Sequence, residues 1–130
     1  MKAALRREVR DLVLVAGGAI PGALLRWRLE GLVAHATGAT LAANLLGCWL
    51  LGMVLARPGR GDRLMLVAGI GFCGSLSTFS TLMLQLSQAL AGGDVGGAVG
   101  LLLASLVGGV AMVALGHRLG AALPGGGERG

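Results

Sequence analysis

The uncharged stretch GFCGSLSTFSTLMLQ, residues 71–85, combines glycines with a dense set of hydroxyl side chains. Gly71 and Gly74 lower helix stability, since glycine costs roughly 1 kcal/mol relative to alanine. The hydroxyls can hydrogen-bond their own backbone in place of the helical ladder; they belong to Ser75, Ser77, Thr78, Ser80 and Thr81. Backbone carbonyls and amides that a broken helix leaves free can bind ions without charged side chains. Ion coordination is therefore the chemistry that this stretch offers.

Two series of polar residues have helical spacing and predict polar stripes. The first is Thr40, Asn44 and Cys48, and the second is Thr78, Thr81, Gln85 and Gln88. The Asn44 amide can donate to an anion through its NH₂ group, or it can hold two helices together by hydrogen bonds. Both roles stay open for Asn44. For the second stripe, the alternative to a polar route is a kinked packing helix whose hydroxyls bond preceding carbonyls.

The elements that carry these residues are predicted to be membrane-spanning helices. Of 130 residues, 55% are hydrophobic and 13% charged, and the mean hydropathy is +0.80. A spanning helix needs about 20 apolar residues, and the charges divide the chain into four such spans, at 12–29, 36–56, 64–90 and 95–116. The expected fold is a single all-α transmembrane domain over residues 1–123, with a disordered tail at 124–130. A first transmembrane helix explains the basic N-terminus better than a signal peptide, because Glu8 and Asp11 interrupt its basic region.

The third of these spans is predicted to be broken in mid-membrane, because its glycines and hydroxyls lie in its middle. Irregular backbone at that depth must be buried in protein or face a wet cavity. Small residues at every fourth position predict two helix-packing seams. They are Ala39, Ala43 and Gly47 in the second span, and Gly100, Ala104 and Gly108 in the fourth. Cys48 and Cys73 fit as small buried residues.

The basic residues are distributed very unequally between the two faces of a four-span chain. Nine of the eleven Lys and Arg residues fall on the face that holds both termini: Lys2, Arg6, Arg7, Arg10, Arg57, Arg60, Arg63, Arg118 and Arg129. Only Arg26 and Arg28 fall on the other face. The positive-inside rule therefore predicts that both termini are cytoplasmic.

Several mechanisms lack the groups that they need. The interior of each span contains no Asp or Glu, so proton exchange through a membrane carboxylate is disfavoured. GFCGSLST is followed by no lysine, so it is not a phosphate-binding loop. Neither histidine lies beside a nucleophile in the sequence, so we expect no enzyme. A passive pore for a small ion or molecule is the function that remains.

Three strings resemble, in order, the signatures of the Fluc/CrcB family of fluoride channels. They are GGAIPGALLRW, GATLAANLLGCWLLG and GFCGSLSTFST, at residues 17–27, 38–52 and 71–81. The resemblance implies an antiparallel, dual-topology dimer of four-helix subunits in the bacterial inner membrane. It also implies two fluoride pores between the subunits and a structural Na⁺ on the two-fold axis. The function implied is passive export of cytoplasmic fluoride down its electrochemical gradient, which lowers fluoride toxicity.

The resemblance also implies roles for individual residues. Backbone carbonyls of Gly74 and Ser77 would hold the sodium ion. The pore lining would include Asn44 and Phe79, with Leu82 at the position of a second phenylalanine; the polar track would comprise Thr78, Ser80, Thr81 and Ser105. An aromatic ring edge carries partial positive charge and can contact an anion. Arg26 would lie in an aqueous vestibule, or its side chain would reach the membrane interface as a snorkelling cation.

Leu82 and the distribution of charge together favour a heterodimer over a homodimer. Leu82 replaces an aromatic residue, and Gln85 stands where an acidic residue is common. A subunit that inserts in both orientations should have similar numbers of Lys and Arg on its two faces. This chain has nine on one face and two on the other, which predicts a fixed orientation. A related chain of opposite orientation would then complete the dimer. The alternative function is a structural partner subunit that lines no working pore itself, and a third is a proton-coupled exporter.

Overall fold

The computed structural model describes residues 2–33, 35–57 and 61–123. Within these ranges the chain is helical and contains no strand. Its elements are α1 (Lys2–Leu32), α2 (Ala36–Leu55), α3 (Gly61–Leu64), η1 (Met65–Cys73), α4 (Gly74–Leu76), α5 (Phe79–Ala91) and α6 (Val95–Ala122). Four helical stretches are long and apolar enough to cross a membrane, with the third formed by Gly61–Ala91. The predicted all-α fold with four spans is confirmed, while the tail at 124–130 lies outside the described residues.

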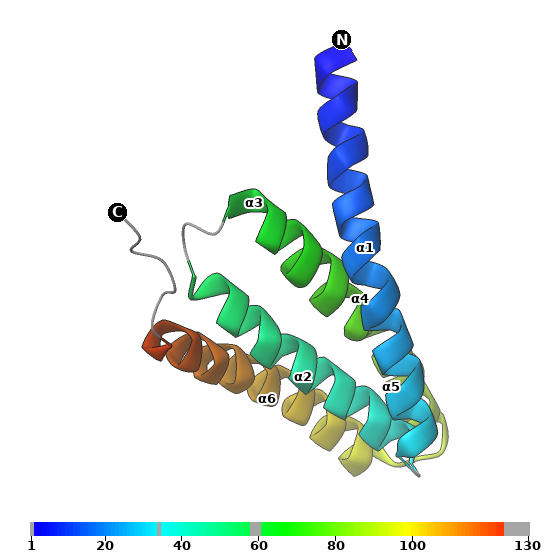
Figure 1. Ribbon diagram of the computed structural model, residues 1–130. Helices are drawn as coiled ribbons and strands as arrows, with labels where there is room; N and C mark the ends of the chain where they lie inside the picture. Colours follow the sequence, from blue (N-terminus) through cyan, green and yellow to red (C-terminus); the bar gives the residue numbers. More distant parts are fainter. Residues whose placement is uncertain (1, 34, 58–60, 124–130) are drawn as a thin grey trace.

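The arrangement of the helices agrees with an even number of spans. Figure 1 shows that the start of α1, the end of α6 and the passage from α2 to α3 lie toward one end of the bundle. The passages from α1 to α2 and from α5 to α6 lie toward the other end. The start of α1 and the end of α6 therefore lie on the same side of the bundle, as four spans require.

Glycine allows α2 and α6 to pack backbone against backbone. A Cβ atom on Gly116 would meet the backbone of Trp49 and Met53, and one on Gly52 would meet the backbone of Val113 and His117. The predicted seam on α2 is confirmed, because Ala39 and Ala43 are fully buried and Gly47 is buried too.

The predicted seam on α6 packs within the chain only at half-buried Gly108, where an added Cβ would meet the Leu45 side chain. Gly100 and Ala104 are exposed, and a Cβ on Gly100 would have nothing within 4 Å. The buried small residues of α6 are instead Ala98, Gly109, Gly116 and Gly120. The last three are spaced seven and four residues apart, which places them on one face.

A second glycine contact joins α1 to η1, which is a π-helical segment. A Cβ on Gly71 would meet Gly18 of α1, and one on Gly18 would meet the backbone of Val67 and Phe72. Ser75 then ties α4 to α1, because its hydroxyl donates to the Ala19 carbonyl at 2.8 Å. The segment from η1 to Ser75, which includes the start of the glycine- and hydroxyl-rich stretch, is thus fixed against α1.

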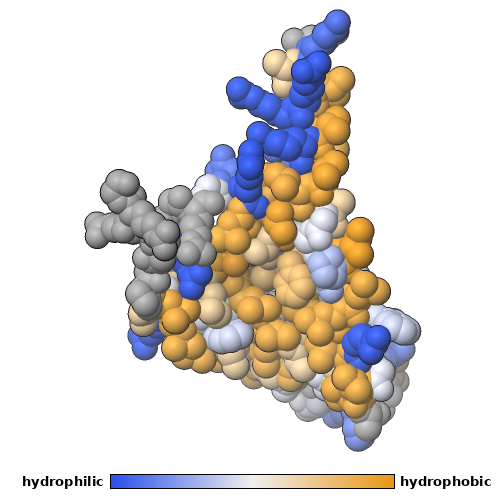
Figure 2. All heavy atoms as spheres, in the orientation of Figure 1, coloured by the Kyte–Doolittle hydropathy of each residue, from blue (hydrophilic) through white to orange (hydrophobic). Residues whose placement is uncertain are grey.

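The surface of the bundle is largely apolar, as Figure 2 shows. Large hydrophobic residues are widely exposed, among them Ile20, Leu103 and Val110 at 63%, 53% and 73%. In a membrane, lipid tails cover such side chains, so the chain needs little interior core. The described residues form a multi-pass membrane protein.

Candidate ion site at the interrupted helix

The helical path stops at Leu76 and resumes at Phe79. Ser77 has extended backbone (φ −77°, ψ 152°), and so has Thr78 (φ −143°, ψ 124°). The Thr78 hydroxyl caps α5, since it accepts from the Thr81 amide at 3.3 Å and donates to the Thr81 hydroxyl at 3.2 Å. Ser77 donates its hydroxyl to the Cys73 carbonyl at 3.0 Å. The Thr78 hydroxyl thus replaces one helical hydrogen bond of the Thr81 amide, whereas the Ser77 hydroxyl shares the Cys73 carbonyl with the Ser77 amide.

Asn44 of α2 holds the backbone at the interruption. Its Nδ2 donates to the Thr78 carbonyl at 3.1 Å, and its Oδ1 accepts from the Thr78 amide at 2.6 Å. Thr78 is 8% exposed, so both backbone groups would otherwise be buried without partners. We call this two-way bond the Asn44–Thr78 clasp. It gives Asn44 the helix-joining role, and it uses one of the two Nδ2 hydrogens.

The clasp and the Thr78 cap each redirect one amide that a continuous helix would bond to a backbone carbonyl. In a continuous helix the Thr78 amide would donate to Gly74, but here it donates to Asn44. The Thr81 amide would donate to Ser77, but it donates to the Thr78 hydroxyl. Gly74 is exposed and Ser77 half-buried. Carbonyl oxygens in this state are the ligands that a hard cation takes, so Gly74 and Ser77 fit the sodium ion that the resemblance implies.

The two predicted polar stripes lie against each other. One turn from the clasp, Gln85 donates its Nε2 to the Thr40 hydroxyl at 2.9 Å, and Thr40 donates to the Ala36 carbonyl at 3.1 Å. Since the Thr40 proton is already used, Gln85 is oriented with its NH₂ toward Thr40. The Gln85 Oε1 is buried and has no hydrogen-bond partner among the described residues. Thr40 and Gln85 therefore belong to the site, although the sequence indicated only that each lies in a polar stripe.

The two apolar residues of α5 that are predicted to line the pore have different surroundings. Phe79 is 73% exposed, whereas Leu82 is 6% exposed and packs inside the subunit. Ser80 is exposed beside Phe79, and its hydroxyl lies 3.3 Å from that of Thr78. In the single chain, Phe79 and Ser80 are thus free for contact with another subunit or with an ion route.

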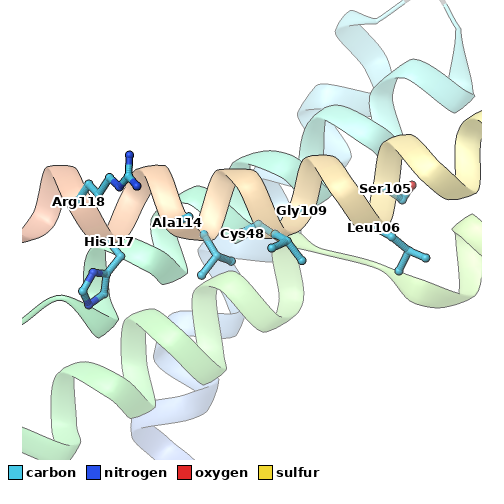
Figure 3. Close-up of a pocket in the computed structure, with 9 residues that line it drawn as sticks. Cys48, Ser105, Leu106, Gly109, Ala114, His117 and Arg118 are labelled. Carbon is cyan, nitrogen blue, oxygen red and sulfur yellow. The ribbon is translucent and has the colours of Figure 1, made fainter.

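Ser105 opens onto a groove along α6. The groove has a volume of about 710 Å³, and Figure 3 shows Ser105 at one end and His117 and Arg118 at the other. Cys48 of α2 lines it beside Gly109. The Ser105 hydroxyl is buried and has no hydrogen-bond partner in the described part of the chain. The described residues therefore leave the hydrogen bond of this hydroxyl unmade.

Arg26 lies away from these groups, near the end of α1. Its side chain is half-buried, and its Nε is 3.9 Å from the Glu30 carboxylate one turn later. The neighbouring Arg28 guanidinium lies over the Trp27 ring, 5.9 Å from its centroid. Exposed pairs of this kind contribute little to stability. The vestibule role of Arg26 stays a prediction.

Comparison with known proteins identifies the family. A family profile described as "CrcB-like protein, Camphor Resistance (CrcB)" matches residues 13–117. The chain is 48% identical to "Fluoride-specific ion channel FluC 2" of Parasynechococcus marenigrum (strain WH8102), covering 89% of this chain and 85% of the relative. It is 37% identical to "Fluoride-specific ion channel FluC 1" of the same organism, covering 85% and 94%. A third relative, "Fluoride-specific ion channel FluC" of Marinobacter nauticus (strain ATCC 700491 / DSM 11845 / VT8), is 41% identical, covering 82% and 90%. The chain therefore belongs to the Fluc/CrcB family.

Proposed function

We propose that the chain is a subunit of a fluoride-selective channel through which cytoplasmic fluoride leaves passively, down its electrochemical gradient. The observation that carries this proposal is the interrupted helix, in a chain whose relatives are named fluoride-specific ion channels. The interruption gathers hydroxyl donors, an amide and an exposed aromatic ring without adding a charged side chain. A weakly binding, multi-site route of this kind lets an ion enter and also leave.

The proposed fluoride route runs past Phe79 and along the hydroxyls of Ser80, Thr81 and Ser105. The ring edge of Phe79 offers partial positive charge that attracts an anion without trapping it. Hydroxyls replace part of the water shell, because each can turn its hydrogen toward the ion. The second Nδ2 hydrogen of Asn44 supplies a further donor beside Thr78. Arg26 would raise the local concentration of anions at the entrance.

A second subunit is needed to close this route. Phe79, Ser80 and Gly74 are exposed in the single chain, and a route along a lipid-exposed face would not conduct. In the proposed antiparallel dimer, the interruptions of the two subunits meet at mid-membrane depth. The Gly74 and Ser77 carbonyls of both chains would then hold a structural Na⁺, which fixes the subunits against each other.

The partner in this dimer is proposed to be a related chain of opposite orientation rather than a second copy. Paired names support this, because Parasynechococcus marenigrum has both a FluC 1 and a FluC 2 among the relatives. The charge tally of nine against two supports a fixed orientation, with both termini in the cytoplasm of the bacterial cell. A homodimer remains the simpler assembly that the tests below distinguish.

The first test is fluoride efflux from liposomes that hold this chain alone, or together with a related partner. We expect efflux only with both chains. If the pair conducts but this chain tolerates changes at its own pore residues, the structural-partner function is supported instead. If neither preparation releases fluoride, the proposed function fails.

Phe79→Leu tests whether this chain lines a working pore. The substitution keeps an apolar side chain of similar volume but removes the ring edge, so we expect fluoride efflux to fall by at least about tenfold, the effect of some 1.4 kcal/mol. Phe72→Leu is the matched control, since Phe72 is the other phenylalanine of the chain and is half-buried in η1. Equal efflux in both variants would exclude Phe79 from the pore.

Orientation mapping tests the heterodimer. When the chain is expressed alone in bacteria with a reporter at its C-terminus, we expect the reporter on the cytoplasmic side in nearly every molecule. The reason is that Lys and Arg near span ends resist translocation. An even mixture of cytoplasmic and external reporters would support dual topology and a homodimer.

A further inference from the structure

The first part of α1 extends beyond the bundle and packs against no other described element. Residues 2–13, here called the N-terminal arm, are exposed except for half-buried Asp11. Packing begins only near Gly18, the first buried residue of α1. Figure 1 shows this part of α1 standing clear of the other helices. The helix has 31 residues, which makes it about 46 Å long against a hydrocarbon core of about 30 Å, so the arm reaches the headgroup region.

Apolar residues form a continuous stripe along the arm and into the span. Leu5, Val9, Leu12 and Val13 are 60%, 51%, 68% and 64% exposed, and their spacing puts them on one helix face. The same face continues with Ala16, Ile20 and Leu24, the last two of which are 63% and 56% exposed. Inside the membrane this stripe faces acyl chains. The apolar side of the arm is therefore continuous with the lipid-facing side of the membrane-spanning part of α1.

Basic residues border this stripe on one side, and Glu8 borders it on the other, three residues from Leu5 and four from Leu12. Lys2, Arg6 and Arg10 are four residues apart and form a row beside the stripe. Asp11 projects from the side of the helix away from the stripe and forms an exposed ion pair of 2.8 Å with Arg10. Figure 2 shows the two kinds of surface side by side on the protruding helix. A helix with an apolar face and a basic flank binds at the interface of an anionic membrane.

We infer that the N-terminal arm binds the cytoplasmic leaflet, with its apolar stripe at the acyl boundary and the row Lys2, Arg6 and Arg10 on the phosphates of anionic phospholipids. This inference does not depend on what the chain transports. It commits to lipid headgroups as the partner, because the stripe continues the lipid-facing side of the same helix.

The test is backbone hydrogen–deuterium exchange of the arm in the full chain, held in nanodiscs. One set contains phosphatidylcholine alone, and the other contains equal parts of phosphatidylcholine and phosphatidylglycerol. Both leaflets are then identical, so the orientation of insertion does not matter. Each basic residue near an anionic surface strengthens binding about fivefold, so exchange of residues 2–13 should be more than about tenfold slower in the anionic discs, and added salt should reverse this.

Substitutions at two neighbouring arginines distinguish lipid binding by the row Lys2, Arg6 and Arg10 from a general effect of positive charge on the arm. Arg6→Gln removes a member of the row and should raise exchange in anionic discs about fivefold. Arg7→Gln makes the same charge change on the side of the helix that faces away from the apolar stripe and should change exchange by less than about twofold. Equal exchange in the two lipid mixtures, or equal effects of the two substitutions, would overturn the inference. So would protection that requires two copies per disc, because the arm would then bind another protein chain.

Discussion

Asn44→Ala is expected to lower the free energy of unfolding by about 2–6 kcal/mol, because it leaves two buried backbone groups of Thr78 without partners at about 1–3 kcal/mol each. The amide and the carbonyl of Thr78 both bond to this one side chain. No neighbouring helix turn can replace the bonds, since Ser77 and Thr78 are extended. Unfolding of the purified chain in mixed micelles, followed by tryptophan fluorescence, measures the change.

Thr81→Ala is the comparison for this prediction. It removes one hydroxyl that bonds only to the Thr78 hydroxyl, at 3.2 Å, and it leaves the Thr81 amide bonded to Thr78. The expected loss is about 1 kcal/mol or less. If Asn44→Ala and Thr81→Ala destabilise the chain equally, the clasp does not hold the interruption. Under the proposed function, Asn44→Ala also abolishes fluoride efflux, because the backbone beside the route loses its fixed position.

Gly116→Ala is expected to disrupt the packing of α2 against α6. The added Cβ would meet the Trp49 carbonyl group and lie 3.2 Å from the Met53 amide nitrogen. These are backbone atoms of a helix, so they cannot move aside without shifting the whole of α2. Overpacking of this kind costs about 1–3 kcal/mol and occasionally more, and the rigid neighbours put this site at the upper end.

Gly100→Ala, in the same helix, is the matched control. Nothing lies within 4 Å of the position that its Cβ would take, so only the gain in helix propensity of about 1 kcal/mol remains. That gain is the same at both sites, and the difference in unfolding free energy between the two variants therefore isolates the clash. We expect a difference of about 3 kcal/mol. Equal stabilities would mean that α2 and α6 do not approach through Gly116.

The four spans and the family were predictable because hydropathy and the three signature strings are local properties of the sequence. The span predicted for 12–29 belongs to a helix that begins at Lys2. A run of apolar residues shows which part of a helix can lie in lipid. It does not show where the helix ends, because charged residues outside the lipid can continue the same helix. The position of the interruption could be predicted from the chemistry of residues 74–78, since glycines and hydroxyls act on their own backbone.

Contacts between helices were less predictable. The packing seam of α2 could be predicted from residue spacing, because only one face of this helix carries small residues at every fourth position. In α6 small residues occur on several faces, so spacing alone selected Gly100 and Ala104, and the close approach to Trp49 selects Gly116 instead. Both polar stripes were visible in the sequence, but their pairing through Thr40 with Gln85 and Asn44 with Thr78 depends on the register between two helices. The dimer and the sodium ion require atoms from a second chain, so they stay proposals.

The Asn44–Thr78 clasp also limits how the length of this chain can vary. An amide side chain reaches one peptide unit, so an inserted or deleted residue between Leu76 and Phe79 would bring a different backbone group to Asn44 and turn α5 by about 100°. Phe79 would then point toward another side of the subunit. Insertions and deletions should therefore be confined to the connections between spans and to the two chain ends.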